Sequence, residues 1–279
     1  MIAIILGLTS AAAWGAADFT GGLASRKTGA YQAVIFGELV GLPVILTASV
    51  LTGERLPVVP VWLLAMLAGA LGTSGLLLLY YSMTRGLMSI ATPVSALLAA
   101  VIPVIVGSVL EQPPGLLVIA GFVLALASVW LISQSEGAMQ DLLSHMNQIK
   151  LPFLAGIGFG LYFVLMHTAT RHATYWPMVA SRSGGILILA FYMIVSRQGW
   201  TPRKSALGMI LLNGLFDIGG NIFFVLAGQA GRLDIAAVLS SLYPGSTLLL
   251  AWIFLRERLS RTQWVGILAA AVAIVFFTL

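Results

Sequence analysis

The chain has 279 residues, of which 59% are hydrophobic and 8% are charged, against about 25% charged residues in a typical soluble domain. This composition excludes a soluble globular protein, because it cannot supply a water-facing surface. The lack of cysteine excludes disulfides, thiolate metal sites and cysteine nucleophiles. The net charge of +5 does not indicate a nucleic-acid partner, because basic and aromatic residues do not alternate along any face. We therefore expect an integral membrane protein surrounded by the lipid bilayer.

The first half of the chain contains five apolar runs, each long enough to cross a hydrocarbon layer of about 30 Å as a helix. The first run has no basic leader and no small-residue cleavage site, so it is interpreted as a retained helix and not as a signal peptide. The five expected helices are Ile2–Ser25, Tyr31–Leu51, Val61–Tyr81, Met88–Leu110 and Gly115–Ser133.

A polar linker follows and divides the chain. It runs from Gln134 to Lys150 and is the longest interruption of hydropathy, so it predicts a boundary between a first unit, 1–133, and a second unit, 151–279. The second unit again contains five apolar runs. These expected helices are Leu151–Thr170, Tyr175–Ser196, Ala206–Gly228, Ile235–Leu255 and Trp264–Leu279.

The two units are related by an internal repeat. A shift of 145 residues aligns five residues of the second unit, Gly231, Ile235, Ser240, Leu242 and Gly266, with their counterparts Gly86, Ile90, Ser95, Leu97 and Gly121. An odd number of helices per unit makes the second unit enter the membrane from the opposite side. The expected fold is therefore an all-α integral membrane protein with ten transmembrane helices in two inverted five-helix repeats. Such repeats underlie many alternating-access transporters, which hold their substrate near the midplane.

Three stretches resemble the EamA-type repeat of the drug/metabolite transporter superfamily. They are WGAADF at 14–19, YYSMTRGLMSIATPVSALL at 80–98 and SLYPGSTLLLAWIFLRERLSRTQWVGILAAAVAIVF at 241–276. The first repeat departs from the pattern at EQPPG, where Glu111 lacks the arginine that follows Glu257 in the second repeat. The resemblance implies a ten-helix permease built from two EamA repeats.

The basic residues of the short loops bear on the orientation. The positive-inside rule places the more basic side in the cytoplasm, which here puts both termini outside it, whereas the family resemblance implies termini inside. Loops on the N-terminal side carry Arg55, Arg171 and Arg232, and the opposite loops carry Arg26, Lys27, Arg85, Lys150, Arg197, Arg203, Lys204, Arg256, Arg258 and Arg261.

Two ionisable residues occupy nearly equivalent places in the two repeats. Glu38 and Arg182 lie near the middle of the second and seventh expected helices, 144 residues apart. Ionisable groups inside apolar helices are costly and mark functional sites by default. We expect the two to form an ion pair or to line one wet cavity. The alternative is an arginine bonded to backbone carbonyls beside a protonated glutamate.

A second polar group follows four-residue spacing. Asn213, Asp217 and Asn221 share one face of the eighth expected helix, and Trp14 and Asp18 share one face of the first. The stripe predicts a hydrogen-bonding wall of a substrate path with Asp217 as a cation or proton site, or else plain interhelical hydrogen bonds. The Trp14 and Asp18 pair suits an amine or quaternary ammonium ligand, through cation–π and Coulomb attraction.

Aromatic residues and prolines complete the candidate site. Tyr80, Tyr81, Phe159 and Tyr162 are expected to extend an aromatic cavity. Prolines interrupt helical hydrogen bonding and commonly mark binding sites or gates. The gating candidates, in the equivalent fourth and ninth helices, are Pro93, Pro103 and Pro244.

No enzyme signature is present. His145 and His172 fall in loops, His167 stands alone, and the Gly156, Gly158 and Gly160 series is better explained by close helix packing. No cofactor or metal is expected.

The sequence thus predicts a secondary transporter in the cell (inner) membrane, multi-pass and monomeric, that moves a small organic metabolite by alternating access. The resemblance suggests amino acids or related compounds, exported or exchanged. One alternative is proton-coupled efflux of lipophilic or quaternary cations at Asp18 or Asp217, with protons as the second partner. Another is a passive channel or a structural membrane subunit.

Overall fold

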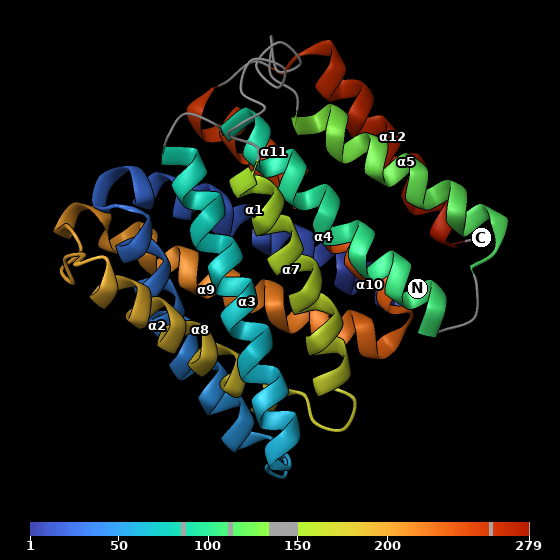
Figure 1. Ribbon diagram of the computed structural model, residues 1–279. Coiled ribbons are helices and arrows are strands. Elements are labelled where there is room, and N and C mark those ends of the chain that lie inside the picture. The colour runs from blue at the N-terminus through green and yellow to red at the C-terminus, as the bar shows by residue number, and fades with distance from the viewer. Residues whose placement is uncertain (85–87, 111–113, 134–149, 257–258, 279) are drawn as a thin grey trace.

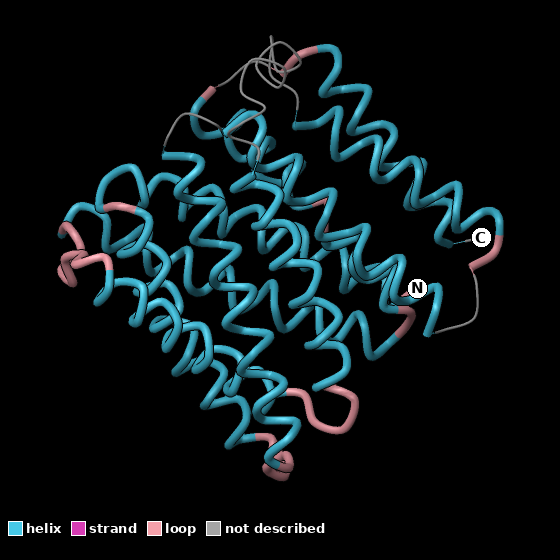
Figure 2. The backbone as a smooth tube through the Cα atoms, in the orientation of Figure 1, coloured by secondary structure: helices cyan, strands magenta, loops and turns pink. Residues whose placement is uncertain are grey.

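The computed structural model describes residues 1–84, 88–110, 114–133, 150–256 and 259–278, and these are helical with short connections and no strand (Figures 1 and 2). The first five helices are α1 (Ile2–Thr28), α2 (Ala30–Leu51), α3 (Val59–Thr84), α4 (Met88–Leu110) and α5 (Leu116–Ser133). The others are α7 (Lys150–Ala169), α8 (Tyr175–Val195), the short η2 (Lys204–Ala206), α9 (Leu207–Ala230), α10 (Leu233–Ser240), α11 (Tyr243–Leu255) and α12 (Arg261–Thr278).

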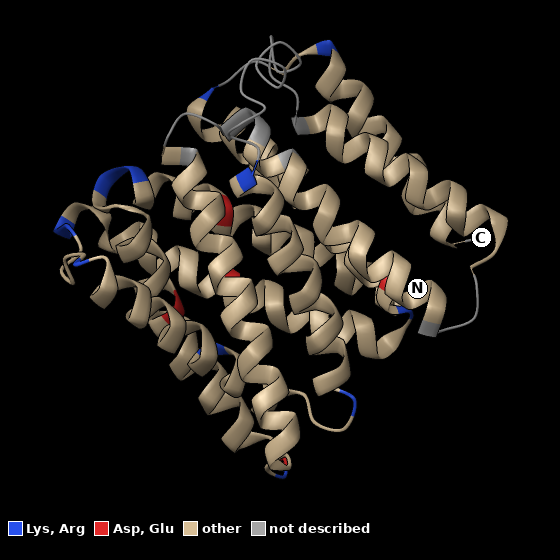
Figure 3. Cartoon of the chain, in the orientation of Figure 1, with Lys and Arg blue, Asp and Glu red and all other residues tan. Residues whose placement is uncertain are grey.

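The described helices fit a membrane-spanning protein. Eight of the spans are long and apolar enough to cross a membrane, with α10 and α11 together forming one of them. Two shorter apolar helices, Val94–Val109 and Leu116–Ile132, bring the set to the ten expected. Large apolar side chains face outward, such as Leu63, Phe191 and Leu268 at 59%, 58% and 65% exposure. This suits a surface in contact with lipid, and Figure 3 shows most Lys and Arg segments at helix ends and loops.

The packing pattern reflects the repeat. α1 packs on α9, and α3 packs on α7. α1 and α7 are the first helices of the two repeats, and α3 and α9 are the third. In both contacts, therefore, the first helix of one repeat packs on the third helix of the other. α2 packs on its own counterpart α8, and α5 packs on α12 to form a pair beside the remaining helices (Figure 1). An in-plane pseudo-two-fold axis between the repeats produces reciprocal contacts of this kind. The expected all-α architecture is confirmed.

The ninth span departs from the expected continuous helix. It is divided into α10 and α11, with Ser241 and Leu242 between them and Pro244 in the first turn of α11. Proline has no N–H, and its ring clashes with the preceding turn, so it suits a helix start better than a helix interior. α4, by contrast, is continuous through Pro93 and Pro103. The two repeats therefore differ at this span.

Glycines allow close approach of helices across the repeat interface. A Cβ atom at Gly69 of α3 would overlap the Ser181 carbonyl of α8, and one at Gly184 of α8 would overlap the Met66 carbonyl of α3. In lipid, such small-residue contacts replace the hydrophobic effect as the basis of helix association.

The glycine series of α7 serves the same purpose. Gly156 and Gly160 face Leu98 and Ile102 of α4, while a Cβ at Gly158 would lie 2.7 Å from the Leu71 carbonyl of α3. The packing interpretation of this series is therefore confirmed. Glu111, Glu257, His145 and the linker residues 134–149 lie outside the described residues.

Candidate functional site

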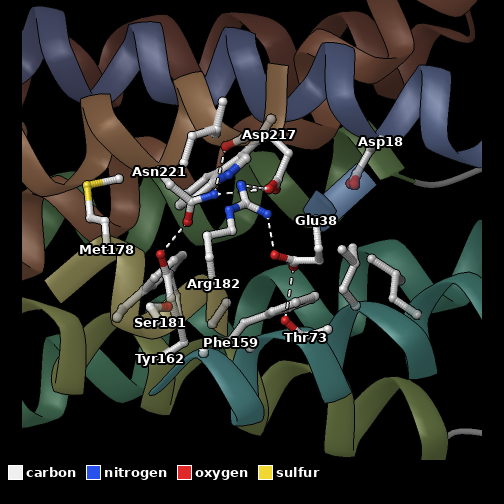
Figure 4. A pocket seen from close by; sticks show the side chains of 18 of the residues that line it. Asp18, Glu38, Thr73, Phe159, Tyr162, Met178, Ser181, Arg182, Asp217 and Asn221 are labelled. Atoms are coloured by element: carbon white, nitrogen blue, oxygen red, sulfur yellow. Dashed lines mark hydrogen bonds and ion pairs between the residues drawn. The ribbon is translucent and has the colours of Figure 1, made fainter. Parts of the chain in front are cut away.

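A cavity of about 90 Å³ lies between helices of the two repeats (Figure 4). Most of the charged residues buried in the helices line it, together with several aromatic rings. Its charged and polar lining consists of Asp18, Glu38, Thr73, Ser181, Arg182, Asp217 and Asn221, and its aromatic lining of Trp14, Phe159, Tyr162, Phe163 and Tyr243.

Arg182 is the centre of a three-residue ion cluster. Its Nη1 lies 2.5 Å from Oε2 of Glu38, and its Nη2 donates to Oδ2 of Asp217. Thr73 Oγ1 donates to the other oxygen of Glu38 at 3.0 Å. Gly41 of α2 gives the guanidinium its space, because a Cβ there would lie 3.1 Å from Arg182 Cζ. The ion pair expected from the sequence is present, and Asp217 adds a partner that the sequence did not indicate.

The cluster continues along α9 and α7. Asn221 Nδ2 donates to the backbone carbonyl of Asp217 at 2.7 Å and to its Oδ2 at 3.2 Å. Tyr162 on α7 donates its hydroxyl to Asn221 Oδ1. A chain of hydrogen bonds thus links Glu38 of α2 to Tyr162 of α7 through Arg182, and both repeats contribute to it.

Asn213 does not line the cavity, although it shares the four-residue spacing. Its Nδ2 donates to the Ala17 carbonyl of α1 at 2.9 Å and to the Tyr80 hydroxyl at 3.2 Å. Residues four apart on a helix differ by about 40° in direction. Over the two steps from Asn221 to Asn213 this turns the side chain from the cavity toward α1. The expected single polar wall is therefore divided into a cavity part and an interhelical part.

Asp18 occupies a different part of the same cavity. It is 7% exposed, and its hydrogen-bond donor is the Tyr80 hydroxyl at 3.4 Å. Among the residues that the structure describes, no Lys or Arg pairs with it. Trp14, one turn earlier, stacks on Phe163 with centroids 5.4 Å apart and an angle of 16°. A carboxyl without a counter-ion beside an aromatic wall is suited to a cationic group.

The remaining candidates lie away from the cavity. Tyr80 is fully buried, and its hydroxyl donates to Asp18 from outside the cavity lining. Tyr81 is 36% exposed and is not in the lining either. Adjacent helical residues point about 100° apart, so both tyrosines cannot face one cavity. Pro103 and Pro244 are buried but do not line it either.

Several lining residues were not expected from the sequence. Thr73, Met178, Ser181, Phe163 and Tyr243 reach the cavity. Two of them carried a usable signal, since Ser181 precedes Arg182 and Tyr243 precedes the proline that interrupts the ninth span. Within the described ranges, no group of three or more His, Cys, Asp or Glu side chains could hold a metal ion.

Comparisons with known proteins agree with this architecture. One solved crystal structure, described only as that of a protein, superposes with a TM-score of 0.79 at 18% sequence identity, over 99% of this chain and 96% of the other. This similarity concerns the fold. No curated protein matches the sequence. A family model described as "EamA-like transporter family" matches residues 1–134 and again residues 148–279. The chain therefore belongs to the EamA-like transporter family, with two copies of the repeat.

Proposed function

We propose that this membrane transporter moves a small organic solute carrying an amino group, an amino acid or a related compound, by alternating access. The observation that supports this proposal most directly concerns Asp18. Its buried carboxyl lies in the cavity between the repeats and has no basic partner among the described side chains. An ionised buried carboxylate is costly unless a positive charge pairs with it. An ammonium group of the solute would provide that charge, and Trp14 would add a cation–π contact.

The ion cluster gives the cavity a second, rigid wall. Arg182 has both terminal nitrogens engaged by carboxylates, and Thr73 and Asn221 satisfy further oxygens. Such a network holds α2, α8 and α9 in register. In the proposed alternation the two equivalent contacts, of α1 with α9 and of α3 with α7, loosen in turn around this shared wall, as inverted repeats allow.

Counterflow in proteoliposomes tests the proposal. Vesicles loaded with an unlabelled amino acid should accumulate the labelled one transiently and saturably, and Asp18→Asn should abolish this without unfolding the protein. Ser205→Asn, at an exposed position of the short η2, is the control. Flux without trans-stimulation would instead indicate a channel and contradict the proposal.

The prolines of the fourth and ninth spans are proposed as bending points. The break between α10 and α11 at Ser241 and Leu242 supports this for Pro244. Pro244→Ala should slow counterflow and leave equilibrium binding close to that of the wild type. The same variant should be compared with Pro103→Ala, because α4 is continuous there. Unchanged rates in both variants would contradict a gating role.

The second candidate is proton-coupled efflux of lipophilic or quaternary cations. The acidic excess of the lining, three carboxyl groups against one guanidinium, favours it. In that case cation binding should release protons into a weakly buffered solution of the purified protein. An amino acid that binds as a zwitterion should release none. Proton release with a quaternary ammonium probe, and no binding of amino acids, would replace the first proposal with this one.

A further inference from the structure

Three aromatic rings separate the cavity from a polar hollow at one end of the bundle. The ring centroids of Phe163 and Phe224 lie 4.4 Å apart, and that of Trp14 lies 5.4 Å from the first and 5.7 Å from the second. Phe163 is 4% exposed and Phe224 is 1% exposed. Trp14 and Phe163 also line the cavity. On this side the cavity therefore ends at a packed apolar contact, here called the aromatic triad.

The hollow begins one helical turn beyond the aromatic triad. His167 follows Phe163 by four residues on α7, and Gly228 follows Phe224 by four residues on α9. Both line a hollow of about 460 Å³ beside the loop from α7 to α8. Cavity, triad and hollow thus follow one another along the same two helices. A dry apolar constriction between two wet spaces can act as a closed gate.

The repeat gives each ring of the aromatic triad a counterpart. At a shift of 145 residues the counterparts are Phe159 for Trp14, Asp18 for Phe163 and Leu79 for Phe224. The packing follows the same relation. A Cβ at Gly220 of α9 would lie 2.5 Å from the Trp14 ring, and one at the counterpart Gly75 of α3 would lie 3.2 Å from the Phe159 ring. The second triad is therefore equivalent to the first in space as well as in sequence.

The second triad, here called the carboxyl triad, faces the cavity. Phe159, Asp18 and Leu79 all line it. Gly22 lies one turn beyond Asp18 on α1, toward the end of the bundle that carries the loop from α8 to α9. Gly22 is buried, yet a Cβ there would meet no described atom within 4 Å. The structure is therefore closed at the aromatic triad and leaves space beside the carboxyl triad.

The pseudo-two-fold axis relates these two arrangements. When inverted repeats rock against each other, each repeat takes up in one state the arrangement that the other repeat has in the opposite state. In the opposite state Asp18 would therefore lie between Phe159 and Leu79, as Phe163 lies between Trp14 and Phe224 here. A carboxylate enclosed by apolar side chains within a membrane is costly unless a positive charge or a proton compensates it.

We propose that the aromatic triad is one gate of the transporter, closed in this structure, and that the carboxyl triad is the opposite gate, which closes over Asp18 only when a cation or a proton compensates its charge. The inference rests on the alternating access of the proposed function. It adds a reason for coupling. An empty protein with an ionised Asp18 is held mainly open toward the loop from α8 to α9, so the protein exchanges one cation for another, and the proton can be one of them.

Access to the cavity from each side tests the aromatic gate. The measurement is the rate at which an impermeant thiol reagent labels Ser181→Cys in oriented proteoliposomes without solute, and His172→Cys identifies the side of the loop from α7 to α8. Phe224→Ala should raise the rate from this side about tenfold or more, because it opens an apolar constriction to water. Phe224→Leu should give a smaller rise. Phe216→Ala, on the exposed face of the same helix, is the control and should change neither rate.

The charge of Asp18 tests the opposite gate in the same assay. Asp18→Asn should shift the ratio of the two rates about tenfold or more toward the side of the loop from α7 to α8, since a neutral side chain avoids the cost of a charge inside the membrane. Asp18→Glu keeps the charge and should match the wild type.

Three results would overturn the gates. They are a rise from both sides in Phe224→Ala, which shows general loosening, an unchanged ratio in Asp18→Asn, and equal shifts in Asp18→Asn and Asp18→Glu. The rates are measured without solute, so they decide the gates independently of counterflow. A wild type with saturable counterflow and any of these three results overturns this inference alone. A wild type without counterflow overturns the proposed function.

Discussion

Arg182 neutralises two buried carboxyl groups, so its removal should be more harmful than removal of the whole cluster. Arg182→Met leaves Glu38 and Asp217 buried without a counter-ion, and breaking a buried ion pair in this way costs about 3–5 kcal/mol. The triple variant Glu38→Leu, Arg182→Met, Asp217→Leu should recover most of that stability, because no uncompensated charge remains. Thermal unfolding in detergent measures both.

The control is Arg203→Met, in an exposed loop, which should unfold like the wild type. Equal destabilisation in the single and triple variants would contradict the account of the cluster. Neither variant of the cluster should transport, because the triple variant recovers the fold and not the polar wall of the cavity.

Gly69 tests the close contact between α3 and α8. A methyl group there would overlap the Ser181 carbonyl, next to Arg182, whereas a methyl group at Gly219 of α9 meets nothing within 4 Å. Gly69→Ala should therefore lower the unfolding temperature and the transport rate. Gly219→Ala should unfold at the wild-type temperature or slightly above it, since alanine is favoured over glycine in a helix and the added methyl group meets no neighbour. A Gly69→Ala protein that unfolds and transports like Gly219→Ala would exclude a tight interface at this point.

At the scale of elements, Glu54 ties the loop before α3 to the start of α8. Its carboxylate accepts from the backbone N–H groups of Thr174 and Tyr175 at 2.9 and 2.8 Å, and its carbonyl accepts from Trp176 Nε1 at 2.9 Å. It thus caps a helix of the other repeat, where a carboxylate also meets the positive end of the dipole.

Replacement of Glu54 by Ala should destabilise the protein by about 0.5–2 kcal/mol, the usual range for a lost N-terminal cap. Chemical denaturation in mixed micelles measures it, with the neighbouring Arg55→Ala as control. The free energy of unfolding should fall clearly in Glu54→Ala and change little in Arg55→Ala. The reverse order would show that the cap does not hold α8 in place.

Hydropathy was sufficient to predict the helices but not their faces. The apolar runs predicted the described spans because a lipid-embedded backbone has to be helical. The pairing of Glu38 with Arg182 was predictable because their places are equivalent in the repeats. The second partner, Asp217, was not, since its direction depends on how α9 rotates against α1. For the same reason the sequence could not show that Asn213 and Tyr81, which it groups with the cavity residues, do not line the cavity. The break before Tyr243 was indicated only by the proline.

At the scale of the whole molecule, the two ends of the bundle differ in charge. The loop between α8 and α9 carries Arg197, Arg203 and Lys204, whereas the loop between α7 and α8 carries Arg171. The positive-inside rule therefore predicts that the first loop is cytoplasmic. The chain has no cysteine, so single cysteines report position without background. In intact cells an impermeant thiol reagent should label His172→Cys and spare Ser205→Cys. The opposite result would place both termini in the cytoplasm.

The central claim is that one cavity between the repeats opens alternately to the two sides of the membrane. Ser181 lines this cavity beside Arg182, and Ser181→Cys introduces a single thiol there. The measurement is the rate at which an impermeant thiol reagent labels this cysteine from each side of oriented proteoliposomes, with and without an amino acid that the protein binds. The account predicts labelling from both sides and protection by the amino acid. Labelling from one side only, or labelling that the amino acid leaves unchanged, would contradict it.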